Sequence, residues 1–317
     1  MEELTIWAVI GFLLAAYSVI GNDSVQTLGT FISSNQKFKW YYLWIFTSVI
    51  LVGTISYSWY TNGGDISHGR LNKIPFETVQ WYHAMAPLVL VILTRIGIPI
   101  STSLLVLSAF ASSLVLEKIL LKSVLGYAIA AVSAYAVWML ISKWDRESNA
   151  IKPEHAKAWR TFQWCSTGFL WFTWLSHDVA NIAVFLPRQL DLPTLIGVLT
   201  VFVIGLAYIF RNKGGKIQKI VTSKSNTSYV RSATLVDLSY AFILIFFKQM
   251  NDIPMSTTWV FVGLLCGREL AIATRRASNY TFKDVFPVVG KDMLKLLFGL
   301  AVSIILALGI QYLDTIF

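Results

Sequence analysis

Long apolar runs separated by short polar loops form the main pattern of this 317-residue chain. A helix needs about 20 consecutive apolar residues to cross the hydrocarbon core of a bilayer. Charged residues make up only 14% of the chain, whereas a soluble domain carries about a quarter. The pattern predicts an all-α integral membrane protein. The apolar runs that reach or approach the spanning length lie at residues 4–34, 40–60, 79–116, 123–141, 162–186, 192–210, 233–273 and 294–313.

Several of these runs contain residues that interrupt a helix. The run at 4–34 is too long for one span and carries the sequence GND at 21–23. The run that opens the second half carries SHD at 176–178. Two further runs contain RIGIPIS and NDIPMS, whose glycine or proline makes a continuous helix implausible. We therefore expect a broken first helix and a helical hairpin in each half of the chain.

An internal repeat relates two pairs of polar motifs. Asp178 follows Asp23 by 155 positions, and Ser256 follows Ser101 by the same offset. The sequences around the two serines, IPISTS and IPMSTT, also match. Because two motif pairs share one offset, we interpret the chain as a tandem duplication.

The number of membrane crossings predicts how the two repeats are related. Each half has three spanning runs plus a hairpin, which makes the number of crossings odd whether the hairpin spans or dips in and returns. The halves should therefore have inverted topology, as in many secondary transporters. We assign residues 1–142 to the first inverted repeat, 143–160 to a linker and 161–317 to the second inverted repeat.

The distribution of basic residues predicts the orientation in the membrane. The net charge of +9 arises mainly from a few loops, including the 143–160 linker and the 211–231 loop. Cytoplasmic loops carry an excess of Lys and Arg, so we expect these two loops in the cytoplasm and both termini outside the cell membrane. The loop at 65–77 is mixed in charge. This pattern accounts for the positive charge without a nucleic-acid partner.

Polar residues inside the apolar runs form the candidate site. A carboxylate in hydrocarbon is costly unless it finds partners, water or an ion. Asp23 and Asp178 are therefore candidates to hold a small cation, such as Na⁺, beside carbonyls freed at a helix break. Further oxygens or donors come from Asn22, Gln26, His177 and Asn181. Hydroxyl groups at the start of the second hairpin arms suit the oxygens of an anion or a sodium ion, and these belong to Ser101, Thr102, Ser256 and Thr257.

Together these motifs resemble those of the inorganic phosphate transporter (PiT) family of sodium- or proton-coupled phosphate symporters. That family carries G-A-N-D-x-A-N near the start of each half and P-x-S-T-T-H later in each half. Here IGNDSVQ and LSHDVAN resemble the first motif, and PISTSL and PMSTTW resemble the second. The chain departs from the motifs at Gln26, His177, Leu104 and Trp259.

The resemblance implies an inverted-repeat fold that is often homodimeric and binds an oxyanion and cations between the broken helices and the hairpin tips. Asp23 and Asp178 would be cation ligands, together with the motif asparagines Asn22 and Asn181. Gln26 and His177 replace motif residues and are assigned to the substrate. The hairpin tips that would line the anion site are Ser101, Thr102, Ser103, Ser256, Thr257 and Thr258.

The function predicted from these features is cation-coupled uptake of inorganic phosphate, with Na⁺ or H⁺ as the coupling ion. Hydroxyls and helix N-termini bind any tetrahedral anion, so transport of another oxyanion such as sulfate stays open. An integral-membrane enzyme that uses His177 and Asp178 is disfavoured, because adjacent residues on a helix point about 100° apart and cannot form a relay. A non-transporting scaffold would leave the paired motifs unexplained.

Overall fold

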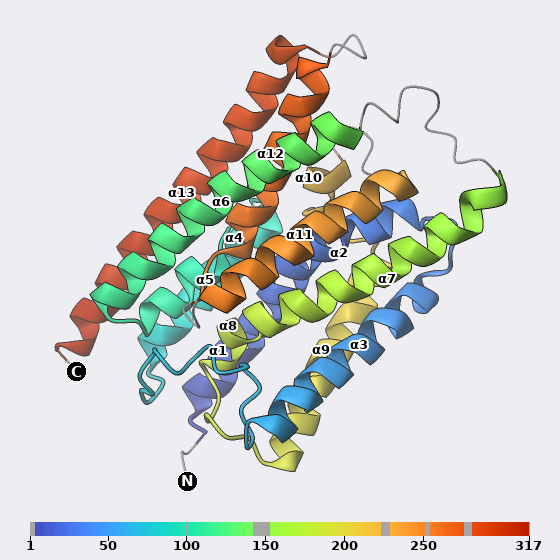
Figure 1. Ribbon diagram of the computed structural model, residues 1–317. Helices are drawn as coiled ribbons and strands as arrows, with labels where there is room; N and C mark the ends of the chain where they lie inside the picture. The colour runs from blue at the N-terminus through green and yellow to red at the C-terminus, as the bar shows by residue number, and fades with distance from the viewer. Residues whose placement is uncertain are drawn as a thin grey trace.

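The computed structural model describes residues 4–98, 100–141, 153–222, 229–250, 254–275 and 281–316. Within these ranges the chain is helical and contains no β-strand, which confirms the all-α class. The helices share a broadly common direction, and both termini lie towards one end of the bundle (Figure 1). The end of α6 (Ser113–Ile141) and the beginning of α7 (Pro153–Asp178) lie towards the opposite end. Most of the predicted linker, 143–152, falls outside the described ranges.

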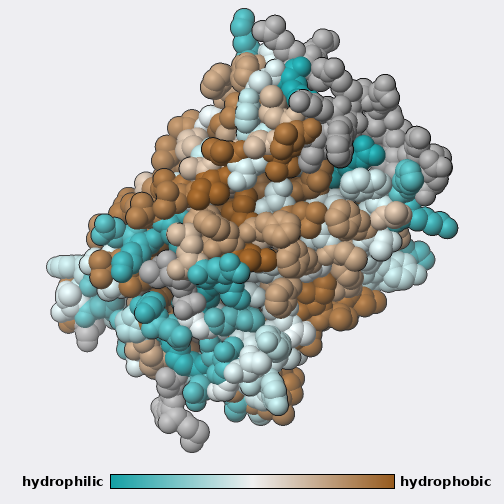
Figure 2. All heavy atoms as spheres, viewed as in Figure 1, coloured by the Kyte–Doolittle hydropathy of each residue, from teal (hydrophilic) through white to brown (hydrophobic). Residues whose placement is uncertain are grey.

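Six helical segments in the described chain are long and apolar enough to cross a membrane, which confirms a multi-pass membrane protein. Their outward faces carry large apolar side chains, such as Ile305, which is 71% exposed. Figure 2 shows a hydrophobic band along the side of the bundle, with hydrophilic atoms gathered towards its two ends. The six segments are α1 to α2, α3 (Trp40–Thr61), α6, α9 (Leu192–Arg211), α11 (Val230–Met250) and α13 (Phe282–Asp314).

The first predicted break is a change of helix type and does not separate two helices. The chain passes from α1 (Ile6–Ser18) through a π-helical segment, η1 (Val19–Asp23), into α2 (Ser24–Ser34) without leaving helical backbone angles. The expectation of freed carbonyls at a gap is therefore wrong here. Inside a bilayer every backbone group needs a partner, and a π turn meets that need while it re-aims its side chains.

The corresponding helix of the second half is interrupted more briefly and ends sooner. Val179 separates α7 from the four-residue helix α8 (Ala180–Ala183), and its backbone N–H still donates to the Leu175 carbonyl at 3.2 Å. The chain then leaves the helix through a turn. The two halves thus place an aspartate at the same point of the helix, but only the first half extends a long helix beyond it.

The two hairpins also differ in length. In the second half, α11 is followed by the 18-residue helix α12 (Thr257–Thr274). In the first half, α4 (Met85–Ile96) ends at Gly97, whose φ of +83° is left-handed, and the return arm consists only of α5 (Thr102–Leu105) and a 3₁₀ turn at Leu107–Ala109.

The predicted boundary between this hairpin and the next span is therefore wrong. The expected hairpin reached residue 116 and the expected span began at residue 123, whereas α6 begins at Ser113. No glycine or proline lies between residues 113 and 123 to end a helix, so α6 continues through this stretch.

Small residues on α12 let two helices approach closely. A β-carbon on Gly263 would lie 2.4 Å from the Tyr127 carbonyl oxygen, and one on Gly267 would lie 1.9 Å from that of Ala131. Only glycine fits at these points, as in other small-xxx-small contacts between membrane helices. This contact between α12 and α6 ties the second hairpin to the last helix of the first half.

Candidate functional site

The two predicted aspartates lie deep in the bundle. Asp23, at the end of η1, is 2% exposed, and Asp178, at the end of α7, is 1% exposed. The charge of Asp178 acts electrostatically on Asp23. Two neighbouring buried carboxylates are stable only if hydrogen-bond donors or positive charge compensate for the lost water.

Asp23 accepts hydrogen bonds from three side chains. The amide of Asn22 donates to Oδ1 at 2.8 Å. The hydroxyl of Thr102, from the first hairpin, donates to Oδ2. The hydroxyl of Thr258, from the second hairpin, donates to Oδ1 at 3.3 Å. The carboxylate is therefore held by its own helix and by both hairpins.

Asp178 has an equivalent set of partners. Thr257 donates to Oδ2 at 2.5 Å, and the amide of Asn181 donates to Oδ1 at 2.9 Å. Ser103, from the first hairpin, donates to Oδ1 at 3.4 Å. Ser103 and Thr258 are related by the 155-residue offset, as are Thr102 and Thr257.

Hydroxyl groups from both halves of the chain thus bind each aspartate. Each aspartate accepts one hydroxyl from the hairpin of its own half and one from the hairpin of the other half. The structure therefore brings eight of the residues singled out in the sequence into one cluster at the interface of the halves. These are Asn22, Asp23, Thr102, Ser103, Asp178, Asn181, Thr257 and Thr258.

Two other predicted residues, Ser101 and Ser256, bind backbone N–H groups and not the aspartates. The oxygen of Ser101 accepts the backbone N–H of Leu104 at 3.1 Å, and that of Ser256 accepts the N–H of Trp259 at 3.2 Å. Both serines are N-caps of the helices that carry the site hydroxyls. Pro99, which precedes the first of them, lies outside the described residues.

Gln26 and Asn181 provide acceptor oxygens at corresponding positions of the repeat. The amide nitrogen of Gln26 donates to Asn22 at 2.8 Å, and that of Asn181 donates to Asp178. Within the described part of the chain, no donor reaches Oε1 of Gln26 or Oδ1 of Asn181, although both residues are at most 2% exposed. Carbonyl and carboxylate oxygens are the ligands of hard cations, so these two oxygens and the two aspartates could hold small cations.

The ring of His177 binds a residue that the sequence did not single out. Nη2 of Arg70 lies 2.6 Å from Nδ1 of His177, and Nε2 of His177 lies 2.8 Å from the Leu244 carbonyl oxygen. Arg70 belongs to the loop predicted outside and is 0% exposed. The available signal was the mixed charge of that loop, since a basic residue on the outer side departs from the positive-inside pattern.

Glu77, His83 and Asp314 form a second group with metal-ligand chemistry, at the end of the bundle where the termini lie. Nε2 of His83 lies 3.9 Å from the Glu77 carboxylate and 3.6 Å from that of Asp314. However, Nδ1 of His83 accepts the backbone N–H of Gln80 at 3.0 Å. Nε2 must then carry the ring proton, so it faces the carboxylates as a donor and not as a metal ligand.

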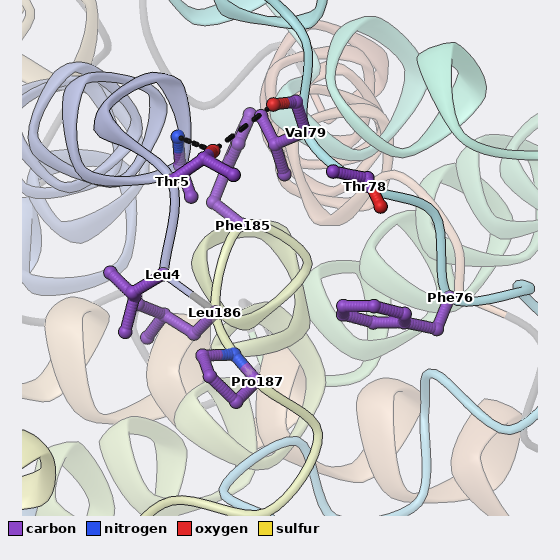
Figure 3. A pocket seen from close by; sticks show the side chains of 9 residues that line it. Leu4, Thr5, Phe76, Thr78, Val79, Phe185, Leu186 and Pro187 are labelled. Carbon is purple, nitrogen blue, oxygen red and sulfur yellow. Dashed lines mark hydrogen bonds between the residues drawn. The ribbon is translucent and has the colours of Figure 1, made fainter. Parts of the chain in front are cut away.

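A cavity of about 250 Å³ lies near the same end of the bundle, between the start of α1 and two loops (Figure 3). None of the predicted site residues lines it. The Thr5 hydroxyl donates to the Val79 carbonyl at 3.1 Å and accepts the Ala8 N–H, so it joins α1 to the loop of the first hairpin. Leu186 and Pro187, which follow α8, form the opposite wall.

Comparison with known proteins gives one informative match. No family model matches the sequence, and no curated protein matches it. A solved structure described as "The sodium-dependent phosphate transporter" superimposes with a TM-score of 0.64 over 100% of both chains, at 17% sequence identity. This similarity shows that the chain has the fold of that protein, an all-α fold with several membrane-spanning helices.

Proposed function

We propose that this protein is a secondary active transporter that takes up inorganic phosphate together with a cation by alternating access. The observation that carries the proposal is the crossed set of hydroxyls around Asp23 and Asp178 at the interface of the halves. The similarity to a sodium-dependent phosphate transporter over the whole chain supports it.

The proposed cation sites rest on charge and on oxygen ligands. Asp23 and Asp178 bring two negative charges into the membrane interior, and the acceptor oxygens of Gln26 and Asn181 lie beside them. A sodium ion at each aspartate would supply the compensating charge, and a proton is the alternative coupling ion. The proposed anion site uses the hydroxyls of the hairpin tips, which can donate to phosphate oxygens when the aspartates turn to their cations.

The proposed alternating access uses inverted repeats. In Figure 1, α1 leads away from the end of the bundle where the termini lie, whereas the corresponding helix α7 leads towards it. The hydrogen bonds of Thr102 to Asp23 and of Thr257 to Asp178 are also related by the 155-residue offset, which supports a repeat. We place both termini outside the cell and the linker and the 211–231 loop in the cytoplasm. A homodimer is proposed from the sequence resemblance alone.

Uptake of labelled phosphate into proteoliposomes tests the function. Uptake is measured with an inward sodium gradient, with a proton gradient and with neither. Stimulation by one gradient is expected and identifies the coupling ion. Folded protein that takes up no phosphate under any gradient would overturn the proposal.

Transport of sulfate is the second candidate, because the hydroxyls recognise a tetrahedral anion without distinguishing its central atom. Unlabelled sulfate that competes better than unlabelled phosphate would favour it. The enzyme hypothesis gains no support from the site, because His177 is engaged by Arg70 and the Leu244 carbonyl and not by Asp178.

A further inference from the structure

The loop after α3 places the side chain of Arg70 inside the bundle, where it is 0% exposed. Gly63, Gly64, His68 and Gly69 all have positive φ angles, so the chain turns tightly. The Asp65 carboxylate accepts the backbone N–H groups of Ser67 at 2.6 Å and Gly69 at 2.9 Å. These bonds lock the loop immediately before Arg70.

Residues of the second half hold this loop in place. The Leu190 N–H donates to the Gly64 carbonyl at 3.0 Å, and its own carbonyl accepts Nε1 of Trp59 at 2.7 Å. Arg188 donates to the carbonyls of Ile74 at 3.2 Å and Pro75 at 3.0 Å. The loop is thus part of the interface between the halves on the side where we place the cell exterior.

The partners of His177 indicate which of its ring nitrogens carries the proton. The Leu244 carbonyl can only accept a hydrogen bond, so Nε2 of His177 carries the proton. Arginine can only donate, and its Nη2 lies 2.6 Å from Nδ1 of His177 and 3.1 Å from Nε2, so Nδ1 is the acceptor. His177 is therefore neutral and acts as the acceptor that holds the guanidinium beside Asp178, on which the Arg70 charge also acts.

Two further cationic side chains act electrostatically on His177. Lys122 of α6 is only 6% exposed, and its charge, like those of Lys248 of α11 and Arg70, acts on His177. Cationic side chains inside a membrane protein are costly and mark the path or the site of a counter-ion. Here three of them act on His177, whose chain neighbour Asp178 accepts the hairpin hydroxyls of Thr257 and Ser103.

We propose that Arg70 is a specificity-determining residue that binds the transported oxyanion, with Lys122 and Lys248 as additional positive charge. This inference rests on the proposed transport function. In the state described, His177 holds the guanidinium, and on substrate entry the guanidinium turns to the anion and donates two parallel hydrogen bonds to it. The cluster suits a doubly charged tetrahedral anion and discriminates against a singly charged one such as nitrate.

The test compares Arg70→Gln and Arg70→Lys with Arg188→Gln. Arg188 is the matched control, because it is an arginine of the same loop interface that donates to backbone carbonyls. Thermal stabilisation of the purified protein by sodium, phosphate, sulfate and nitrate is measured in detergent, and KM and Vmax for uptake are measured in proteoliposomes.

Arg70→Gln is expected to raise the KM for the anion at least tenfold and to remove its stabilisation by the anion, while stabilisation by sodium stays. Arg70→Lys should lie between this variant and the wild type. Arg188→Gln removes contacts of the loop but keeps the Arg70 guanidinium, so it should lower the unfolding temperature and change the KM less than either Arg70 variant. An unchanged KM and anion response in Arg70→Gln would overturn the inference. Equal losses of sodium and anion responses in Arg70→Lys and Arg70→Gln would also overturn it, since they indicate a structural role.

The same measurements separate this inference from the proposed function. If sulfate but not phosphate stabilises the wild type, phosphate transport is wrong, and the role of Arg70 is then decided by the sulfate response of Arg70→Gln. If neither anion stabilises or is taken up by the wild type, both proposals are overturned.

Discussion

Thr258 donates its hydroxyl to Oδ1 of Asp23 at 3.3 Å, although 235 positions separate the two residues in the chain. Its counterpart is the contact of Ser103 with Asp178, at 3.4 Å. Neither contact can form within one half, so the site exists only when the halves are packed together. A relative movement of the halves must break or exchange these bonds, which links the proposed cation site to the conformational change that the proposed transport requires.

Replacement of either aspartate by asparagine is expected to abolish coupled uptake. Asp23→Asn and Asp178→Asn keep the size of the side chain but remove the charge that a cation needs. A loss of at least about 100-fold in the initial rate corresponds to about 2.7 kcal/mol. Rates in proteoliposomes measure the loss, and size-exclusion profiles verify folding.

The control for this pair is Asp191→Asn. Asp191 caps α9 by accepting the Thr194 N–H at 3.0 Å, and asparagine caps a helix equally well. This variant should therefore transport like the wild type. Normal uptake by Asp23→Asn or Asp178→Asn would remove the proposed cation site.

Removal of a threonine hydroxyl at the site should shift the half-saturating sodium concentration. Thr102→Val and Thr257→Val keep the shape of the side chain but deprive a buried carboxylate of a donor. A hydrogen bond to a charged group contributes about 1.5–3 kcal/mol, so the half-saturating sodium concentration should change at least several-fold. Sodium dependence of uptake measures it, and a sodium curve that coincides with the wild type would contradict the assignment.

The two capping serines should respond differently. Ser101→Ala and Ser256→Ala remove an N-cap, which typically contributes about 1 kcal/mol to stability. We expect a lower unfolding temperature and little change in half-saturating sodium. The reverse pattern, with normal stability and weakened binding, would show that these serines contact a ligand, as the sequence resemblance implied.

Gly267 should not tolerate a methyl group. Gly267→Ala would place its β-carbon 1.9 Å from the Ala131 carbonyl and force α12 away from α6. Overpacking of this kind costs about 1–3 kcal/mol, and the unfolding temperature in detergent measures it. Gly309→Ala is the matched control, because no atom lies within 4 Å of its added β-carbon. Equal stability of both variants would contradict the close approach of the helices.

Asp237 is expected to support the fold without binding the cation. It is fully buried on α11 and accepts the hydroxyls of Thr30 at 2.6 Å and Thr167 at 2.5 Å, so it joins α2 and α7. Asp237→Asn weakens this pair of bonds and should cost about 1–3 kcal/mol of stability, with the sodium dependence of the remaining uptake unchanged. A shift in half-saturating sodium larger than that of Thr102→Val would place Asp237 in the ion path instead.

The sequence by itself determined the membrane class, the positions of most apolar segments and the correspondence of Asp23 with Asp178 in the repeat. These features depend on local composition and on a repeat, both of which can be read along the chain. The capping role of the hydroxyl at Ser101 was also within reach, because N-cap bonds join residues only three positions apart.

Only the tertiary structure decided which hydroxyl meets which carboxylate, because the contact of Thr258 with Asp23 depends on how two distant hairpins pack. It also decided that residues 19–23 form a π segment and not a gap, since backbone groups inside a bilayer must stay hydrogen-bonded. The burial of Arg70 against His177 was likewise decided by packing, since the mixed charge of its loop pointed to an unusual residue but not to its partner. A loop arginine normally faces water, and its buried position here results from the tight turn of its loop and the partner that the second half presents.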